Sequence, residues 1–261
     1  MSTRTYWSHP TPRVALITGG ASGIGQATAL RFAREGAAVA LLDRNAEGLA
    51  RTAAEIGDAE RALVLTADLR DEAATVAAVD RAAAWRGRLD AVINVAGISP
   101  PEEFLGAPRV YWDTMVQVNL RGTYVVAQAG ARHLVTGGGG AIVNVSSVLA
   151  LVADPSLVVY SATKGGISAM TRAMAVNLAK HQVRVNAVCP GDVATPLLED
   201  WIAKQPDPAA TRSQIASAYP LGHYCNPEDV AAAILFLSGP DARCITGTNL
   251  VIDCGLTVTC Y

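Results

Sequence analysis

The sequence predicts an α/β fold with a parallel sheet covered by helices on both faces, and three observations support this prediction. Short, almost continuously apolar segments alternate with longer segments of helical periodicity. A glycine-rich turn joins the first apolar segment to the first helical one. No repeat or linker divides the 261 residues. Because buried parallel strands are joined by right-handed helical crossovers, we expect a single doubly wound domain.

The apolar segments are the expected strands, and the periodic segments between them are the expected helices. Strands are predicted at residues 13–18, 38–42, 62–66, 91–95, 141–146, 183–188 and 249–252. Helices are predicted at residues 25–35, 46–56, 72–85, 111–134, 160–180 and 228–237. The alternation breaks at residues 194–222, which contain prolines and two short helical segments, 197–203 and 209–218. Such an insertion after a strand predicts a small helical lid over a ligand; the alternative is a surface helical hairpin.

Composition excludes several classes of protein. The chain is 51% hydrophobic and 17% charged, so it can bury a large core and disorder is excluded. A net charge of −2 gives no attraction to nucleic acid or to anionic membranes. No apolar run reaches the roughly 18 residues that span a bilayer. Residues 1–12 lack the apolar core of a signal peptide, so we expect an N-terminal tail before a domain at 13–261 and a cytoplasmic location.

Cysteine and histidine give no sign of a metal site or a disulfide framework. The five cysteines are odd in number and include no C-x-x-C pair, and the four histidines share no ligand spacing. We therefore expect no bound metal.

The turn after the first expected strand reads Thr18-Gly-Gly-Ala-Ser-Gly23-Ile-Gly25. Glycines at these positions allow a tight turn and let the backbone approach a pyrophosphate at a helix N-terminus. A flexible glycine loop is the alternative, but the position between first strand and first helix favours a dinucleotide site. The candidate cofactor-binding residues of this turn are Gly19, Ser22, Gly23, Ile24 and Gly25.

The second expected strand leads into Asp43, eighteen residues after Gly25. A carboxylate there can accept hydrogen bonds from the ribose hydroxyls of NAD. It would repel the 2′-phosphate of NADP by roughly 3 kcal/mol per unit charge at about 5 Å. Arg44 is the counterargument, because its guanidinium suits a phosphate, although neighbours on a strand point to opposite sides. We include both residues in the candidate site and predict NAD.

Further candidate cofactor residues follow the later strands, where small or polar residues meet a bound nucleotide. Asp68 either binds the adenine amine or caps the next helix. Thr195 is placed to meet the nicotinamide amide. The full set comprises Asp68, Leu69, Asn94, Ala96, Gly97, Pro190, Gly191, Val193 and Thr195.

The spacing Tyr160-Ser-Ala-Thr-Lys164, thirteen residues after Ser147, is the main catalytic signal. On a helix, residues four apart share a face, so the phenol lies beside the ammonium. A charge at about 4 Å supplies about 4 kcal/mol at a dielectric near 20, enough to lower the tyrosine pKa by about three units. The alternative for this pair is a solvated helix face. Asn119, among apolar neighbours, is either a hydrogen-bonded buried residue or part of the site.

Taken together, these motifs resemble those of the short-chain dehydrogenase/reductase family over about residues 13–255. The resemblance implies a Rossmann-type sheet of about seven strands. It implies a tetrad of Asn119, Ser147, Tyr160 and Lys164. Tyr160 would be the acid/base; Lys164 would bind the nicotinamide ribose and lower the Tyr160 pKa. Ser147 would orient the substrate oxygen, and Asn119 would hold a water.

The resemblance also implies a homotetramer built through the helices at 111–134 and 160–180. Two departures are mild: Val95 replaces an asparagine in the motif after the fourth strand, and Cys254 replaces a glycine near the C-terminus. The substrate pocket is expected at Ser99, Leu149, Asp154, Val193 and the lid, where Lys204 and Arg212 are candidates to bind an anionic group.

The leading hypothesis is an NAD-dependent alcohol dehydrogenase whose partner is a small secondary alcohol or ketone. The rival within the class is an NADPH-dependent carbonyl reductase. A catalytically silent nucleotide-sensing protein is the rival from another class, and the intact Ser147–Tyr160–Lys164 set argues against it. A methyltransferase shares the glycine-rich turn but has no use for this set.

Overall fold

The computed structural model describes residues 6–8, 11–101 and 103–259. In this part of the chain one parallel sheet of seven strands has the order β3-β2-β1-β4-β5-β6-β7, which confirms the predicted fold class. The strands are β1 (Val14–Thr18), β2 (Ala38–Asp43), β3 (Ala62–Thr66), β4 (Ala91–Asn94), β5 (Gly140–Val145), β6 (Val183–Pro190) and β7 (Asn249–Ile252). The order reverses between β1 and β4, and ligands of open α/β sheets bind at such a switch point.

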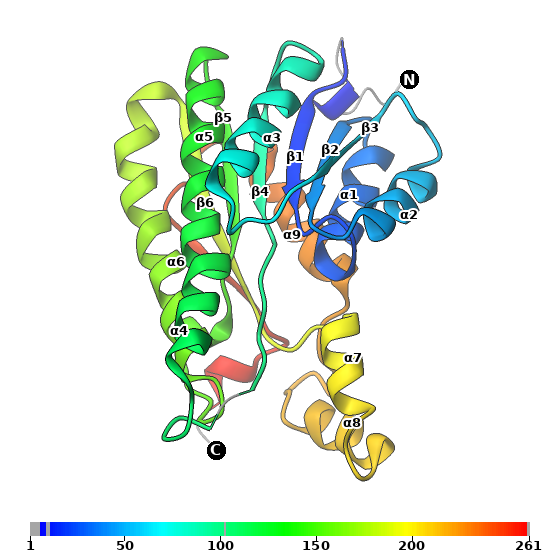
Figure 1. The fold of residues 1–261 in the computed structure, drawn as a ribbon, viewed down its shortest axis with the longest axis vertical. Coiled ribbons are helices and arrows are strands. Elements are labelled where there is room, and N and C mark those ends of the chain that lie inside the picture. Colours follow the sequence, from blue (N-terminus) through cyan, green and yellow to red (C-terminus); the bar gives the residue numbers. More distant parts are fainter. Residues whose placement is uncertain (1–5, 9–10, 102, 260–261) are drawn as a thin grey trace.

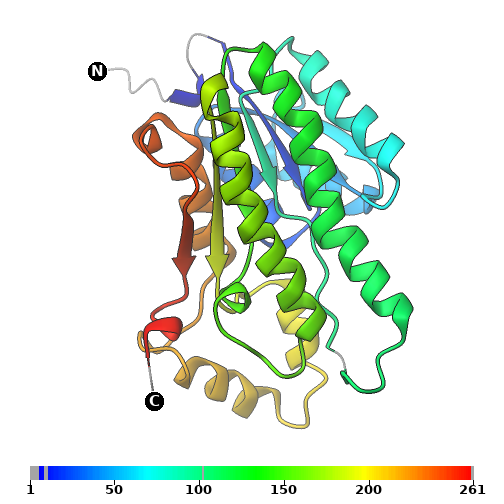
Figure 2. The ribbon, with the colours of Figure 1, turned by 90° about the vertical axis from the view of Figure 1, so that its left-hand side faces the viewer.

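Helices cover both faces of this sheet (Figure 1). One face is covered by α1 (Gly23–Arg34), α2 (Ala46–Ile56) and α9 (Pro227–Ser238). The other is covered by α3 (Glu72–Trp85), α5 (Thr123–Thr136) and α6 (Val158–Leu178), and Figure 2 shows α5 and α6 side by side in front of the strands. Strand alternation divides the core: Leu16 packs toward α3 and α5, and Ile17 packs toward α1 and α9. Both side chains are fully buried, which contributes about 2 kcal/mol each.

The helix predicted at residues 111–134 is divided in the structure. It consists of α4 (Arg109–Met115), a π-helical turn at Val116–Gly122 and α5. A π-helical turn widens the helix locally and is frequent at functional sites. Asn119 lies in this turn and is fully buried.

The insertion after β6 forms two short helices, α7 (Pro196–Ile202) and α8 (Pro208–Ser217), which extend beyond the end of the sheet (Figure 1). Each helix has a proline in its first turn, where the missing N–H costs no hydrogen bond. The Asp207 side chain caps α8 by accepting from the Ala210 N–H. The insertion at 194–222 therefore forms a helical pair after the carboxyl end of β6, which we call the lid, and its role as a cover over a ligand stays a prediction.

Part of the expected N-terminal tail packs on the domain. Residues Tyr6–Ser8 form a 3-10 turn, and the buried Trp7 ring lies 4.6 Å from the Phe32 ring. The Arg13 guanidinium lies 4.0 Å from the centre of the Tyr6 ring. The other residues of the tail, 1–5 and 9–10, lie outside the described residues, as does Cys260.

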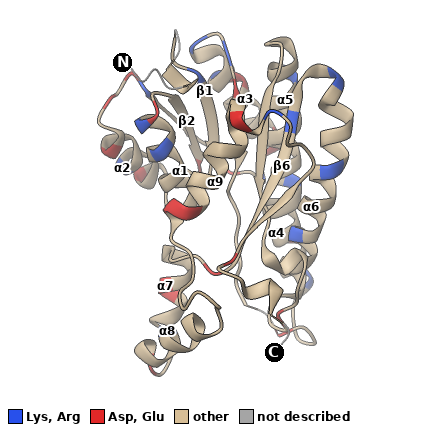
Figure 3. Ribbon diagram, turned by 180° about the vertical axis from the view of Figure 1, so that it is seen from behind, with Lys and Arg blue, Asp and Glu red and all other residues tan. Residues whose placement is uncertain are grey.

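Among the described residues, no helix is long and apolar enough to cross a membrane, and no group of side chains could hold a metal ion. Both signs of charge are distributed over several helices (Figure 3). The described cysteines are free thiols, although the Sγ atoms of Cys225 and Cys254 lie 3.9 Å apart.

Candidate active site

A cavity of about 620 Å³ lies at the carboxyl ends of β1 to β5 and reaches α6 and the start of the lid. We call it the larger cavity. It brings together most of the predicted cofactor residues: Gly19, Ser22, Gly23, Ile24, Gly25, Asp43, Arg44, Asp68, Leu69, Ala96, Gly97, Tyr160, Lys164 and Thr195, with Ser99 from the predicted substrate set. The predicted residues Asn94, Asn119, Ser147, Pro190, Gly191 and Val193 are not in its lining.

The glycine turn fits closely around its own backbone. A Cβ on Gly25 would lie 2.0 Å from the Gly19 carbonyl oxygen, and Gly19 has a φ of +71°, so neither position accepts a larger residue. Ser22 precedes α1 in an extended conformation and makes no side-chain cap, and the first turn of α1 has no acidic residue. The helix N–H groups and positive dipole end are therefore open to an anion, which fits the pyrophosphate of a dinucleotide.

The adenosine end of the larger cavity contains a carboxylate and a guanidinium together. Asp43 ends β2, and its carboxylate accepts from the Asn45 N–H at 3.0 Å and the Ala21 N–H at 3.3 Å. Arg44 also lines the cavity. Since β2 ends at Asp43, strand alternation does not set the direction of the Arg44 side chain, and both residues line the cavity.

Asp68 lines the cavity and does not cap the following helix. The cap of α3 is Asp71, whose side chain accepts from the Ala74 N–H at 3.0 Å. Asp68 forms an ion pair with Arg70 at 2.6 Å, and the hydrogen bonds from Arg70 hold the Asp68 pKa below its usual value against the opposing effect of burial. The structure thus removes the helix-cap alternative for Asp68 and adds Arg70 to the cavity wall.

The end of β4 is fixed to β1 by a residue that sequence reasoning did not assign. The buried Thr18 hydroxyl accepts hydrogen bonds from the N–H groups of Val95 (3.0 Å) and Ala96 (3.1 Å). Asn94 lies behind the cavity, where its amide donates to Asn144 at 2.9 Å. The wall after β4 packs closely on its neighbours, because a Cβ on Gly97 would lie 3.3 Å from the Asn119 Oδ1 and 3.7 Å from the Lys164 Nζ.

Asn119 is held by backbone on both sides of its amide. Its Oδ1 accepts from the Ile98 N–H and its Nδ2 donates to the Ile98 carbonyl, both at 2.9 Å. The Asn119 carbonyl accepts from the Thr123 hydroxyl at 2.7 Å. Asn119 therefore joins the π-helical turn to the loop after β4, next to the cavity wall. The sequence does not predict the π-helical turn at Val116–Gly122.

Ser147 contacts Tyr160, which lines the larger cavity, although Ser147 is not itself in the lining. Ser147 follows β5, its hydroxyl accepts from the Leu149 N–H at 3.1 Å, and it hydrogen-bonds with Tyr160. The neighbouring Ser146 points the other way and donates to the Lys164 carbonyl at 2.9 Å. This opposite orientation is the one that strand alternation predicts for adjacent serines.

Lys164 and Tyr160 share a helix face, but their ionisation differs from the expectation. Burial raises the pKa of Tyr160 to about 12; the hydrogen bond with Ser147 opposes this and the charge of Asp192 adds to it. Burial lowers the pKa of Lys164 to about 8. The Lys164 Nζ donates to the Val145 carbonyl at 2.8 Å and lies 5.4 Å from the Tyr160 ring centre. The Tyr160 pKa is therefore raised, where the sequence led us to expect it lowered, because burial is the largest effect on the phenol.

The predicted substrate residues are less concentrated than the cofactor residues. Leu149 and Asp154 do not line the larger cavity, and the Asp154 carboxylate accepts from the Ser156 N–H and hydroxyl. Lys204 and Arg212 also lie outside its lining, and Arg212 forms an ion pair with Glu199.

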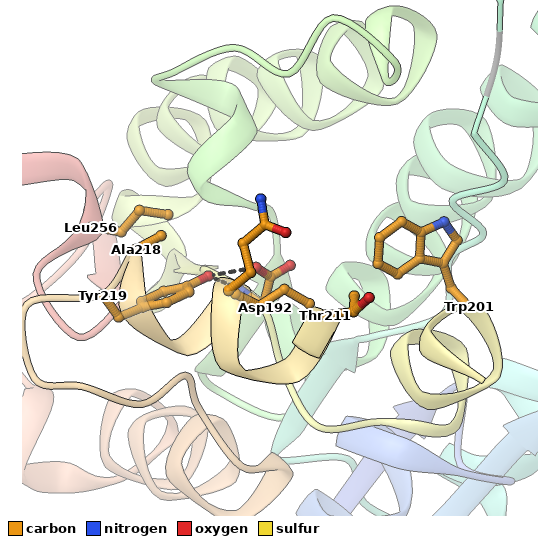
Figure 4. A pocket seen from close by; sticks show the side chains of 8 residues that line it. Asp192, Trp201, Thr211, Ala218, Tyr219 and Leu256 are labelled. Atoms are coloured by element: carbon orange, nitrogen blue, oxygen red, sulfur yellow. Dashed lines mark hydrogen bonds between the residues drawn. The ribbon is translucent and has the colours of Figure 1, made fainter. Parts of the chain in front are cut away.

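A second cavity of about 330 Å³, which we call the smaller cavity, lies between the lid helices and the turn at Leu256. Figure 4 shows Asp192 and Tyr219 joined by hydrogen bonds in its wall, with Trp201 on the opposite side. Sequence reasoning did not assign these three residues, although Asp192 lies inside the motif that follows β6.

Known proteins resemble this chain over nearly its whole length. Residues 19–257 match the family model described as Enoyl-(Acyl carrier protein) reductase. The chain is 41% identical to cis-4-hydroxycyclohexanecarboxylate dehydrogenase of Sinomonas cyclohexanicum, over 94% of this chain and 96% of that protein.

Two solved structures are also similar. A putative short-chain alcohol dehydrogenase from Sinorhizobium meliloti 1021 is 35% identical, with a TM-score of 0.89 over 95% of this chain and 97% of that one. A 3-ketoacyl-(acyl-carrier-protein) reductase from Brucella melitensis, complexed with NADH, is 36% identical, with a TM-score of 0.85 over 94% of this chain and 98% of that one.

Proposed function

The chain belongs to the short-chain dehydrogenase/reductase family, as an oxidoreductase that transfers a hydride between a nicotinamide cofactor and an alcohol or ketone, and from that premise we propose that its cofactor is NAD and that Tyr160 is its acid/base group. The observation that carries the proposal is the position of Tyr160 and Lys164 in the same cavity as the glycine turn. A dinucleotide that begins at this turn ends beside the phenol.

Each polar group around Tyr160 has a distinct task in this mechanism. During alcohol oxidation the Tyr160 phenolate takes the hydroxyl proton, and in ketone reduction the phenol returns it. Ser147, hydrogen-bonded with Tyr160, holds the substrate oxygen at hydrogen-bond distance. Lys164 binds the nicotinamide ribose hydroxyls. A nicotinamide held at this place would supply the hydride acceptor or donor, and its oxidised form would bring a positive charge to the phenol.

Asp43 supports NAD as the cofactor, because its carboxylate would repel a 2′-phosphate. Arg44 in the same cavity favours the rival, an NADPH-dependent carbonyl reductase. Steady-state kinetics with both cofactors, for the wild type and Asp43→Ala, separate the two. We expect the wild type to prefer NADH by about a hundredfold and the variant to lose most of that preference. A wild-type preference for NADPH would show that Arg44 dominates.

The acid/base assignment is tested by Tyr160→Phe, with Tyr124→Phe on the exposed face of α5 as a matched control. We expect Tyr160→Phe to lower kcat by about a thousandfold or more while NADH still binds within about twofold. Tyr124→Phe is expected to change neither quantity. Unchanged turnover of Tyr160→Phe would exclude the mechanism. A wild type that binds NADH and oxidises no alcohol would favour the nucleotide-sensing alternative.

A homotetramer remains part of the proposal. The outer faces of the predicted interface helices carry exposed apolar residues, among them Trp112, Tyr124 and Val176. Exposed aromatic and aliphatic groups of this kind favour burial between subunits. Light scattering after size exclusion gives the mass directly. The cytoplasmic location and the absence of nucleic-acid and membrane partners stay predictions.

A further inference from the structure

The smaller cavity lies within electrostatic reach of the proposed proton-transfer group. Helix α7 borders both cavities: Leu197 lines the larger one, and Trp201 lines the smaller one. Asp192 follows the end of β6 and lines the smaller cavity, and its charge acts on the Tyr160 phenol. Because Leu197 and Trp201 lie one turn apart on α7, the two cavities are neighbours along this helix, and a substrate that has its reacting carbon at Tyr160 and passes α7 would reach the smaller cavity.

We propose, resting on the dehydrogenase function above, that the smaller cavity receives the part of the alcohol remote from the reacting carbon, and that Asp192 is the specificity-determining residue there. Asp192 selects alcohols whose remote part carries no negative charge and donates a hydrogen bond, as a second hydroxyl group does. It discriminates against alcohols whose remote part is a carboxylate.

Charge is the first argument. Among the described residues that line the smaller cavity, Asp192 is the only one that is an Asp, Glu, Lys, Arg or His. The cations of the lid do not compensate it: Lys204 and Arg212 are not in the lining, and Arg212 pairs with Glu199. A substrate carboxylate here would meet a carboxylate without a counterion, and that repulsion raises its KM.

The second argument is the fixed position of the carboxylate. The Tyr219 hydroxyl donates to Asp192 Oδ2 at 2.8 Å and accepts from the Asp192 N–H at 2.7 Å. Tyr219 is itself buried, and a Cβ on Gly191 would lie 3.0 Å from the Tyr219 oxygen. This arrangement orients the carboxylate, while Asp192 Oδ1 receives no hydrogen bond from residues in the described part of the chain. An oriented acceptor with a free oxygen suits a hydroxyl donor.

The remaining wall suits a hydroxylated and uncharged group. Thr211 and Gln214 of α8 contribute neutral groups that both donate and accept hydrogen bonds, as a hydroxyl does. Trp201 contributes an aromatic surface on the opposite side (Figure 4). Such a wall binds a carbon skeleton with hydroxyl groups through apolar contact and neutral hydrogen bonds.

The test compares alcohols that differ in one group: cis-4-hydroxycyclohexanecarboxylate, its carboxamide, cis-1,4-cyclohexanediol and cyclohexanol. For the wild type we expect kcat/KM for the carboxamide to exceed that for the carboxylate by about tenfold, since solvent screens an exposed charge. The diol is expected to exceed cyclohexanol by several-fold, chiefly through KM. In Asp192→Asn, which keeps an acceptor for Tyr219, we expect the carboxamide-to-carboxylate ratio to approach one.

Matched controls on the lid are Lys204→Ala and Arg212→Ala, which are expected to leave that ratio unchanged. A wild type that oxidises the carboxylate as well as the carboxamide overturns the proposal without any variant. An unchanged ratio in Asp192→Asn overturns the role of Asp192, and a diol that is oxidised no better than cyclohexanol overturns the selection for a hydrogen-bond donor. If the wild type oxidises none of these alcohols while still binding NADH, the dehydrogenase function fails as well, an outcome distinct from a reversed preference.

Discussion

The two ends of the larger cavity are built differently. The nucleotide end is formed by the closely fitting backbone turn at residues 19–25, whereas the reaction end is formed by the ionisable side chains of Tyr160 and Lys164. The glycine turn leaves no space for a Cβ at Gly25 and uses positive φ angles at Gly19 and Gly23. The reaction end places Tyr160 and Lys164 in surroundings that oppose their charged forms. The first end is complete in the folded chain. At the reaction end the Tyr160 pKa depends on the neighbouring charges, so we expect cofactor binding to change it.

The largest expected effect follows from a methyl group at the nucleotide end. In Gly25→Ala the new Cβ would overlap the Gly19 carbonyl, so the turn must shift. We expect NADH affinity to fall by about a hundredfold and the free energy of unfolding to fall by about 2 kcal/mol. Calorimetric titration and urea unfolding measure the two quantities.

Gly165→Ala is the matched control, because a Cβ on this residue of α6 has no atom within 4 Å. It is expected to keep NADH affinity and to change stability by no more than about 1 kcal/mol, toward greater stability. Equal NADH binding by Gly25→Ala and Gly165→Ala would show that the close backbone fit is not what holds the cofactor.

The second prediction concerns the buried lysine at the reaction end. The Lys164 pKa is lowered from 10.5 to about 8, so between these values the unfolded chain holds more protons than the folded one. The free energy of unfolding therefore falls as the pH is lowered from 10.5 to about 8, and it rises again as the pH is raised. Relative to Lys164→Met, the wild type should gain about 3 kcal/mol between about pH 7 and pH 10.5.

The exposed Lys180 provides the control for this titration. Urea unfolding of Lys180→Met over the same pH range is expected to follow the wild type. If the stability difference between the wild type and Lys164→Met does not change with pH, Lys164 is not a destabilised buried cation, and the contrast between the two ends weakens.

The smallest expected effect concerns a residue outside the larger cavity that has a backbone conformation typical of glycine. Cys254, after β7, has a φ of +48°, a region that favours glycine, and its side chain contacts Cys225 and His223. We expect Cys254→Gly to be more stable than Cys254→Ala by about 1 kcal/mol, because both lose the thiol and only the glycine removes the strain. Equal thermal midpoints for the two variants would show that this backbone is not strained.

The sequence predicted the nucleotide end well, for a physical reason. Strand periodicity and the glycines at 19, 23 and 25 are local constraints, so the turn and the strand ends follow from the residues themselves. Asp71 rather than Asp68 caps α3, an ambiguity of three residues that spacing could not resolve. The π-helical turn around Asn119 packs on α6 and is joined to Ile98 by the Asn119 amide, and one sequence does not display such long-range contacts.

The reaction end was harder to predict, because ionisation depends on burial. The four-residue spacing of Tyr160 and Lys164 gives their shared helix face but not the loss of solvent around them. The smaller cavity joins Asp192, Tyr219 and Leu256, which are far apart in sequence, and only the folded lid brings them together. Lys204 and Arg212 were predicted from their charge alone, and neither residue lines the larger or the smaller cavity.

The most direct test of this account is an ultraviolet titration of the Tyr160 phenolate, taken as the difference between the wild type and Tyr160→Phe. Without cofactor we expect a pKa near 12, set by burial. With saturating oxidised cofactor we expect the pKa to fall by about two units or more, because the oxidised nicotinamide brings a positive charge beside the phenol at a pH where Lys164, with its pKa of about 8, is neutral. The reduced cofactor, which lacks that charge, should lower it less. A Tyr160 pKa that is the same with and without oxidised cofactor would contradict the account.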